Sequence, residues 1–159
     1  MMLIRPTDDR ITVRRATVSD AADISALYVH FLLSYGHDSE RETVTRFIGC
    51  LLAEPWVAFF VAIDVSNKIV GFAGSTLTYS AVSRAPAITI NDMFVDAVVR
   101  RRGVATALCG AIEAHARRNG FAKIFLETAP DAEAAIALYK KVGFETRPYL
   151  AMTRELPDV

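Results

Sequence analysis

Short runs of alternating hydrophobic and polar residues open the chain and then give way to helical spacing. Residues 11–14 alternate as a strand does, and apolar positions three and four apart predict a helix over 20–33. A shorter helix is expected over 43–52, where Glu54-Pro55 stops it. Three strands should follow, the first two as an antiparallel hairpin or meander, at 56–64, 69–77 and 87–95.

Beyond residue 95 the apolar positions take up helical spacing. Gly103 opens a segment whose apolar residues share one helix face, and Asn119-Gly120 ends it. A short apolar strand at 121–126 lies between this helix and a last one at 132–142, which favours a parallel neighbour reached by a crossover. Strand-like alternation returns at 144–146 and 149–156.

One domain accounts for the chain of 159 residues and 17.5 kDa. No internal repeat, low-complexity tract or linker divides it. We therefore expect an N-terminal extension over residues 1–10 and a single mixed α+β domain over 11–156, with helices packed on a central, partly parallel sheet.

Composition and charge exclude several classes of protein. With 52% hydrophobic residues the chain can bury a core, and 18 Lys+Arg balance 18 Asp+Glu. A general nucleic-acid or membrane-surface protein would need a basic excess, so neither partner is expected. The longest apolar runs, such as 56–63, are eight residues, against roughly 20 for a membrane span. The N-terminus lacks the features of a signal peptide, and we expect a cytoplasmic protein.

Neither the cysteines nor the histidines indicate a metal site. Cys50 and Cys109 lie in apolar surroundings without a CxxC pattern, which predicts buried, reduced thiols. His30 and His37 have no accompanying carboxylate ligands, so we expect no metal. No Gly-x-Ser-x-Gly motif is present, and this disfavours a covalent acyl-enzyme.

The most informative stretch is the junction between strand 87–95 and the helix opened by Gly103. Such a junction directs backbone N–H groups and the positive end of a helix dipole to one point, which suits a phosphate. Cations are unfavourable there, so three successive arginines, at 100–102, need an anion or a carboxylate partner; the alternative is a solvated charge run. Residues 98–123 hold six basic residues and one acidic residue, a local net of +5 that leaves −5 elsewhere.

Three motifs in order identify the chain as similar to the GNAT N-acetyltransferase superfamily. Arg100-x-x-Gly103-x-Ala105 resembles its acyl-coenzyme A signature, 91–95 (Asn-Asp-Met-Phe-Val) its central strand, and 138–144 (Leu-Tyr-Lys-Lys-Val-Gly-Phe) its closing motif. The resemblance covers roughly residues 11–156. It is strongest to a branch with diamine, polyamine and small histone-type acetyltransferases. It implies the GNAT fold, with six to seven strands in a mixed sheet and about four helices.

The resemblance also implies acetyl-coenzyme A as co-substrate. In the family the pantetheine arm pairs with the central strand, here at Phe94 and Val95. The thiol end points to the closing-motif tyrosine, here Tyr139, and many relatives carry an asparagine where this chain has Ala132. The pyrophosphate lies on the glycine turn, here Arg100, Arg101, Arg102, Gly103, Val104, Ala105 and Thr106.

Acetylation of an alkyl amine needs a base, because such an amine, of pKa about 10.4, is almost wholly protonated at pH 7. Asp92 is the candidate, acting directly or through a water, because an ionisable residue within an apolar strand requires a role or a partner. Alternatively, it accepts hydrogen bonds from turn amides. Asn91 would face the other way in a regular strand, unless a bulge intervenes, and is a candidate for orienting a water or the acceptor. Tyr139 is the candidate acid for the departing thiolate, or else a core tyrosine.

We therefore expect direct acetyl transfer in a ternary complex to a primary amine of a small molecule or peptide. The alternative is an acetyl-coenzyme A sensor or regulatory module with little turnover. The acceptor stays open among polyamine, amino acid, antibiotic and protein amines. By resemblance, the protein is expected to form a homodimer.

Overall fold

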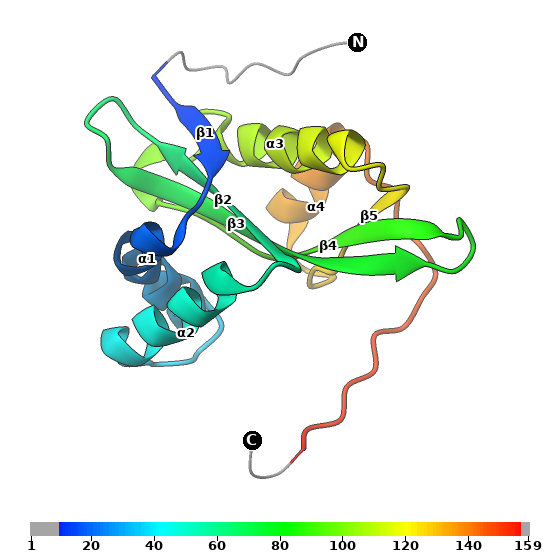
Figure 1. The fold of residues 1–159 in the computed structure, drawn as a ribbon, viewed down its shortest axis with the longest axis horizontal. Coiled ribbons are helices and arrows are strands. Elements are labelled where there is room, and N and C mark those ends of the chain that lie inside the picture. The colour runs from blue at the N-terminus through cyan, green and yellow to red at the C-terminus, as the bar shows by residue number, and fades with distance from the viewer. Residues whose placement is uncertain (1–9, 157–159) are drawn as a thin grey trace.

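The computed structural model describes residues 10–156, and within them five strands form one mixed sheet in the order β1-β2-β3-β4-β5 (Figure 1). Successive strands pair antiparallel as far as β4, whereas β5 pairs parallel to β4. The expected extension over residues 1–10 lies outside the described residues except for Arg10. The strand bounds are β1 Thr12–Arg15, β2 Val57–Ile63, β3 Ile69–Ser80, β4 Ala85–Val95 and β5 Lys123–Leu126.

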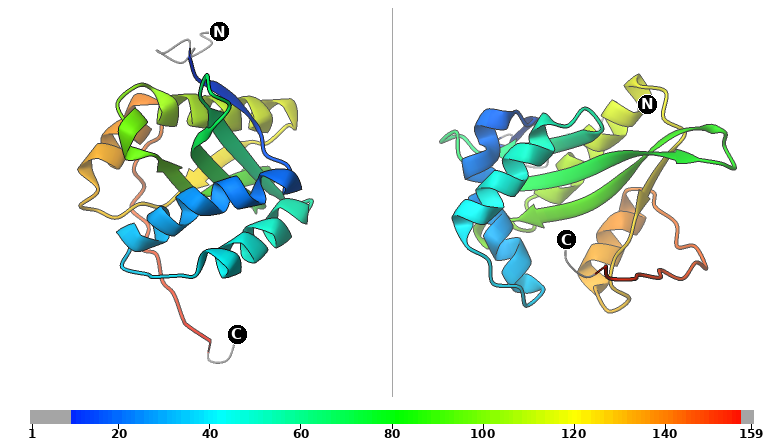
Figure 2. Two further views of the ribbon diagram at one scale, coloured as in Figure 1. Left: turned by 90° about the vertical axis from the view of Figure 1, so that its left-hand side faces the viewer. Right: turned by 60° about the horizontal axis from the view of Figure 1, so that its bottom comes forward.

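Helices cover both faces of this sheet. The pair α1 and α2 lies on one face and α3 on the other, where α3 forms the crossover between the parallel strands β4 and β5 (Figures 1 and 2). The bounds are α1 Ala21–Ser34, α2 Arg41–Ala53, α3 Val104–Arg118 and α4 Glu133–Lys141, with 3-10 turns η1 Val18–Asp20 and η2 Ala97–Val99.

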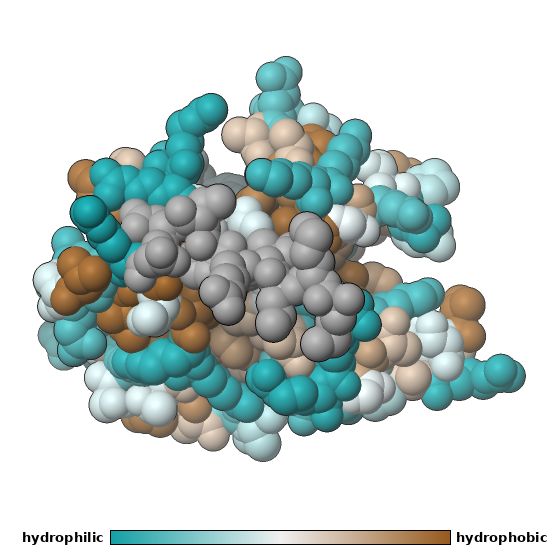
Figure 3. Space-filling view, turned by 90° about the horizontal axis from the view of Figure 1, so that it is seen from above, coloured by the Kyte–Doolittle hydropathy of each residue, from teal (hydrophilic) through white to brown (hydrophobic). Residues whose placement is uncertain are grey.

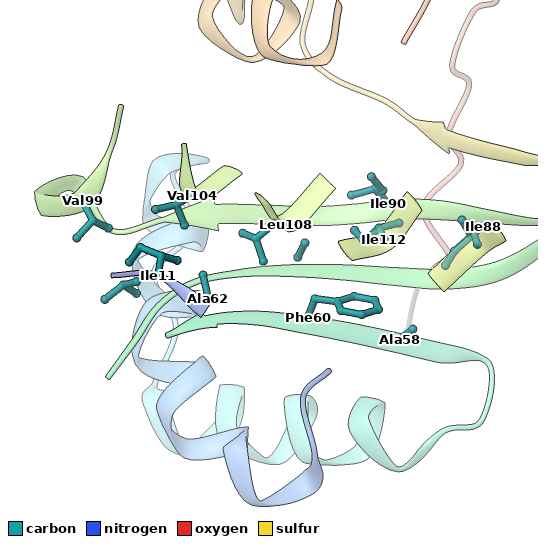
Figure 4. Packing of buried hydrophobic residues seen from close by; sticks show 13 residues of the cluster. Ile11, Ala58, Phe60, Ala62, Ile88, Ile90, Val99, Val104, Leu108 and Ile112 are labelled. Atoms are coloured by element: carbon teal, nitrogen blue, oxygen red, sulfur yellow. The ribbon is translucent and has the colours of Figure 1, made fainter. Parts of the chain in front are cut away.

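Strand β2 is buried along its whole length, because its two faces belong to two different cores. Its odd-numbered residues, such as Phe59 and Val61, pack with α1 and α2. Its even-numbered residues, such as Phe60, pack with the apolar face of α3, which includes Leu108 and Ile112 (Figure 4). The apolar run expected at 56–64 is thus a central strand that is hydrophobic on both faces rather than on one.

The mixed α+β class is confirmed, but the expected six to seven strands are not all present. The described residues form five, because 142–156 adopts no helix or strand. Alternation alone does not make a strand: Tyr149, Leu150 and Met152 are 83%, 91% and 90% exposed, and no described strand pairs with them. Figure 1 shows this segment leaving the body of the molecule.

The two cysteines differ in exposure, and hydrophobic residues are scattered over the surface. Cys109 is buried as expected, but Cys50 is exposed, because α2 turns Val44 and Ile48 toward the core instead. Seen from the α3 side, hydrophobic residues form separate patches among hydrophilic ones (Figure 3). No helix within residues 10–156 is long and apolar enough to cross a bilayer.

The start of α1 depends on a buried carboxyl group. Asp20 is 7% exposed and receives two hydrogen bonds of 2.8 Å from the Arg14 guanidinium and one of 2.7 Å from the Thr17 amide. The arginine bonds lower the pKa of Asp20 from 3.8 to about 2. This interaction ties β1 to the first turn of α1.

We predict that Asp20→Asn destabilises the protein by about 1.5–3 kcal/mol at pH 7, the range for a buried hydrogen bond to a charged group, because the Arg14 guanidinium loses its carboxylate partner. Because the folded-state pKa is depressed, the carboxylate stabilises the fold above pH 4, and this is lost as the pH falls through 2. The gap in unfolding temperature between wild type and variant should therefore narrow below pH 4. The exposed Asp23→Asn is the control, and a gap that stays constant down to pH 2 would contradict the prediction.

Candidate functional site

A β-bulge in β4 decides which way the candidate base points. Gly74 of β3 pairs with Asp92, whereas Ser75 pairs with Ile90, so Asn91 is an extra residue. Side chains alternate along a strand, and an extra residue reverses the alternation that follows it. Ile90 therefore packs with the α3 core, while the Asp92 side chain contacts α1 and Phe94 packs with the α1 and α2 core. In a regular strand, Asp92 would face α3.

The bulge lies beside a position that only glycine can fill. A Cβ on Gly74 would lie 2.5 Å from Cζ of the Phe59 ring, which covers this residue from the neighbouring strand. Phe59 in turn stacks with Phe72 at 6.2 Å between ring centroids. The ring thus fills the space that a side chain at 74 would take, opposite Asp92.

Asp92 is half-buried and accepts a hydrogen bond of 3.0 Å at Oδ2 from the hydroxyl of Tyr28 on α1. Burial raises the pKa of the Asp92 carboxyl above its usual value, and the Tyr28 bond partly offsets this by favouring the ionised form. Burial also raises the pKa of Tyr28 far above neutral pH, so the phenol stays protonated and donates. Such a carboxylate can take a proton more readily than an exposed one.

The side chain of Asn91 bonds to a partner other than Tyr28 or Asp92. Its side chain is exposed, and its Oδ1 accepts a hydrogen bond of 2.8 Å from Thr76 Oγ1 on β3. The bulge thus places the Asn91 side chain at the surface of the sheet, where it forms no side-chain hydrogen bond with Asp92.

Strand β4 loses one of its two neighbours at the bulge. Its parallel pairing with β5 runs from Ala87 to Ile90 and ends where β5 ends, at Leu126. From Asn91 to Val95, β4 keeps its partner β3, but no described strand pairs along its other edge. Backbone groups on that edge therefore have no partner strand and can pair with an extended ligand, apart from the Val95 carbonyl, which accepts a hydrogen bond from Arg100.

The turn after β4 starts α3 with amides that have no partner within the helix. Gly103 takes φ +81° as the residue before the helix, a conformation that a side chain disfavours, and Arg101 also has positive φ. The N–H groups of Val104, Ala105 and Thr106 form the first helical turn and have no partners within it, and that turn holds no acidic side chain. This end of the helix suits an anion.

The Arg100 side chain folds back onto β4 instead of extending from the turn. Its Nε donates to the Val95 carbonyl at 3.0 Å, and its guanidinium carbon lies 5.4 Å from the Phe94 ring centroid. Phe94, Val95 and Arg100 thus lie together at the end of β4. That they hold one ligand, as the family resemblance implies, stays a prediction.

Tyr139 lies on α4, half-buried, with its ring 5.7 Å from that of Phe144. Burial, and then the proximity of Cys109 and Tyr35, raise its pKa to about 12, so its hydroxyl is protonated at neutral pH. Tyr139 and Asp92 have no recorded contact. Both are linked to residues toward the end of α1: Asp92 bonds to Tyr28, Tyr35 acts on the pKa of Tyr139, and the Phe31 ring contacts both tyrosine rings.

Tyr28 is the site residue that sequence reasoning missed. It lies on the apolar face of the expected helix together with Ile24 and Leu27, where its ring alone explains its presence. Its hydroxyl could have indicated a polar contact, since a buried polar atom needs a hydrogen-bond partner. Within residues 10–156, no group of three or more side chains suited to metal binding is found.

Comparison with known proteins points to one family. The sequence profile of the acetyltransferase (GNAT) family matches residues 24–144. The chain is 27% identical over 135 residues to the uncharacterized N-acetyltransferase YhfO of Bacillus subtilis, covering 85% of this chain and 90% of that one. It is 28% identical over 141 residues to the uncharacterized N-acetyltransferase MJ1207 of Methanocaldococcus jannaschii, covering 86% and 61%. The crystal structure of a probable acetyltransferase has the same fold, with a TM-score of 0.84 at 23% identity, covering 93% and 99%.

The close approach of Phe59 predicts a cost for any side chain at residue 74. Gly74→Ala should destabilise the protein by about 1–3 kcal/mol, as overpacked cores do, because the ring must move and with it the strand opposite the bulge. The matched control is Gly110→Ala, which meets no atom within 4 Å on α3 and should be neutral or stabilising. Denaturant unfolding measures both, and equal stability of the two variants would refute the constraint.

Proposed function

The chain belongs to the GNAT acetyltransferase family, and on that premise we propose that it transfers an acetyl group directly from acetyl-coenzyme A to a primary amine of a small molecule or peptide in a ternary complex. The observation that carries the proposal is the half-buried Asp92 carboxyl, which lies beside the stretch of β4 that lacks a second neighbour. A base is needed there because the amine must lose a proton before it can attack.

The co-substrate of the family fits the residues present. When bound, acetyl-coenzyme A supplies an acetyl group activated as a thioester. The open edge of β4 at Phe94 and Val95 offers backbone partners to an extended arm, and the start of α3 offers amides and positive charge to its phosphates. The residues that would hold the phosphates are Arg100, Arg101, Arg102, Gly103, Val104, Ala105 and Thr106.

Asp92 takes the proton from the ammonium group in this mechanism, directly or through a water. The neutral amine then forms the new C–N bond while the C–S bond breaks and the electron pair leaves with sulfur. Tyr139 donates a proton to that sulfur, which its pKa of about 12 permits because the phenol is protonated at neutral pH. The nitrogen loses its second proton as the amide forms, and this proton passes through solvent to restore the Tyr139 phenol. Asn91, at the surface of the bulge, is assigned to orienting the acceptor or a water.

Proposals also extend to the acceptor, the cellular location and the oligomeric state. The branch proposed is the one with diamine, polyamine and small histone-type acetyltransferases, and the acceptor stays open among polyamine, amino acid, antibiotic and protein amines. The protein is proposed to be cytoplasmic and to form a homodimer. Neither nucleic acid nor a membrane is proposed as a partner, because 18 Asp+Glu balance 18 Lys+Arg and the formal net charge is zero.

Turnover tests the proposal most simply. Protein, acetyl-coenzyme A and a panel of primary amines are incubated, and free thiol is measured. We expect thiol release that depends on the amine. Binding of acetyl-coenzyme A without amine-dependent release would overturn the enzyme assignment in favour of a sensor or regulatory module.

Asp92→Asn should lower kcat by about 10²-fold or more, the usual contribution of a general base, with little change in the Kd for acetyl-coenzyme A. The control Asp23→Asn removes an exposed carboxylate from the same side of the sheet, on α1, and should leave both constants unchanged. Full turnover by the Asp92 variant would exclude its role as base.

Tyr139→Phe should lower kcat by about 10²-fold, because the sulfur would leave without its proton donor. The ring and its contact with Phe144 are kept, so stability should change little. The matched control is Tyr149→Phe, whose side chain is exposed. Unchanged kcat in the Tyr139 variant would remove the acid assignment alone and leave the rest of the proposal intact.

A further inference from the structure

The ring of Tyr28 is fixed in place on three sides. It is 5% exposed and stacks on Phe72 with ring centroids 5.2 Å apart and planes at 21°. Phe31 and Phe47 contact it edge to face at 5.2 and 6.2 Å. A ring held in this way has little freedom, so the position of its hydroxyl is set by the packing of α1 and α2 against the sheet.

The hydroxyl is directed at one oxygen of Asp92 and leaves the other available. Tyr28 donates to Oδ2, and among residues 10–156 no hydrogen bond to Oδ1 is recorded. No buried side-chain oxygen among the described residues lacks a hydrogen-bond partner, so Oδ1, which has none, is not a buried atom and is accessible to a ligand. One oxygen is thus held by the helix, and the other is left for the reaction.

No charged side chain among the described residues bonds to the Asp92 carboxyl. Within the described residues Asp92 forms no ion pair, its partner on β3 is Gly74, and Tyr28 is the one side chain that acts on the pKa of its carboxyl. On α1, the titratable residues near the C-terminal half are Tyr28, the exposed His30 and Tyr35, and only Tyr28 bonds to the carboxyl. Stabilisation of the carboxylate at this depth therefore depends on the phenol.

We propose that Tyr28 is a positioning residue, which holds Oδ2 of Asp92 so that Oδ1 faces the acceptor amine and takes its proton. The inference rests on the proposed function of Asp92 as base. The ammonium proton moves to Oδ1, the phenol keeps its own proton throughout, and the carboxylic acid later returns its proton to solvent. The C–N bond forms and the C–S bond breaks as already described.

The direct test is the pKa of Asp92 itself, measured by carbon NMR of the side-chain carboxyl and assigned with Asp92→Asn. Tyr28→Phe removes one oxygen atom and keeps the ring. Because the lost bond favoured the ionised form, the Asp92 pKa should rise by about one unit in this variant. Replacement of Tyr28 alone by 3-fluorotyrosine, a stronger donor of nearly the same shape, should lower it and keeps the test available if the phenylalanine variant folds poorly.

Kinetics separate positioning from a merely structural role. In Tyr28→Phe, kcat should fall about tenfold, KM for the amine should change little, and the acid limb of kcat/KM should move to higher pH with the NMR value. In the double variant with Asp92→Asn, Tyr28→Phe should cause no further fall in kcat, because both substitutions act through the Asp92 carboxyl. The control is Ser25→Ala, which removes another buried hydroxyl bond, to Thr45, from the same helix.

An Asp92 pKa that is the same in wild type and Tyr28→Phe would overturn the inference, as would a shift of equal size in Ser25→Ala. Failure of the proposed function looks different. In that case Asp92→Asn keeps full turnover, while Tyr28→Phe still shifts the pKa of the Asp92 carboxyl. This result would overturn the catalytic role of the pair, because Asp92 would not be the base.

Discussion

The β-bulge at Asn91 is the constraint on which the rest of the site depends. A regular β4 would direct Asp92 into the apolar core beneath α3, where an ionised carboxyl would be costly. One extra residue turns it to the opposite face, toward α1 and the Tyr28 hydroxyl. The same bulge lies where β5 stops pairing with β4, so the carboxyl and the open backbone edge occur at one place.

The two cores that enclose the sheet give the site its rigidity. On one face, the stacked rings of Phe59, Phe72 and Phe94 form a continuous surface under α1, and Tyr28 lies on it. On the other face, α3 packs through Val104 and Leu108, which fixes where its first turn lies. Packing thus places the Asp92 carboxyl on one side of the strand and the first turn of α3 beyond it, and within the described residues Asp92 forms no ion pair.

Much of this could be predicted from local sequence. Asp92, an acid inside an apolar strand, stands out without any knowledge of the fold, and so does Gly103, which follows three arginines. Both belong to the candidate site. The Tyr28 contact could not be predicted, because it joins residues 64 positions apart through a bulge that alternation alone does not reveal. The closing strands were wrongly expected because alternation over 149–156 says nothing about whether a sheet edge is available to pair with it.

The central claim is that the chemistry takes place on the α1 side of β4, at the end of its pairing with β5. A crystal structure with acetyl-coenzyme A and an amine bound would test it most directly. We predict that the thioester lies along the open edge of β4, with the amine nitrogen within hydrogen-bonding reach of Asp92 Oδ1 and the sulfur near the Tyr139 hydroxyl. A thioester bound elsewhere, or an amine on the α3 side of the sheet, would contradict the account.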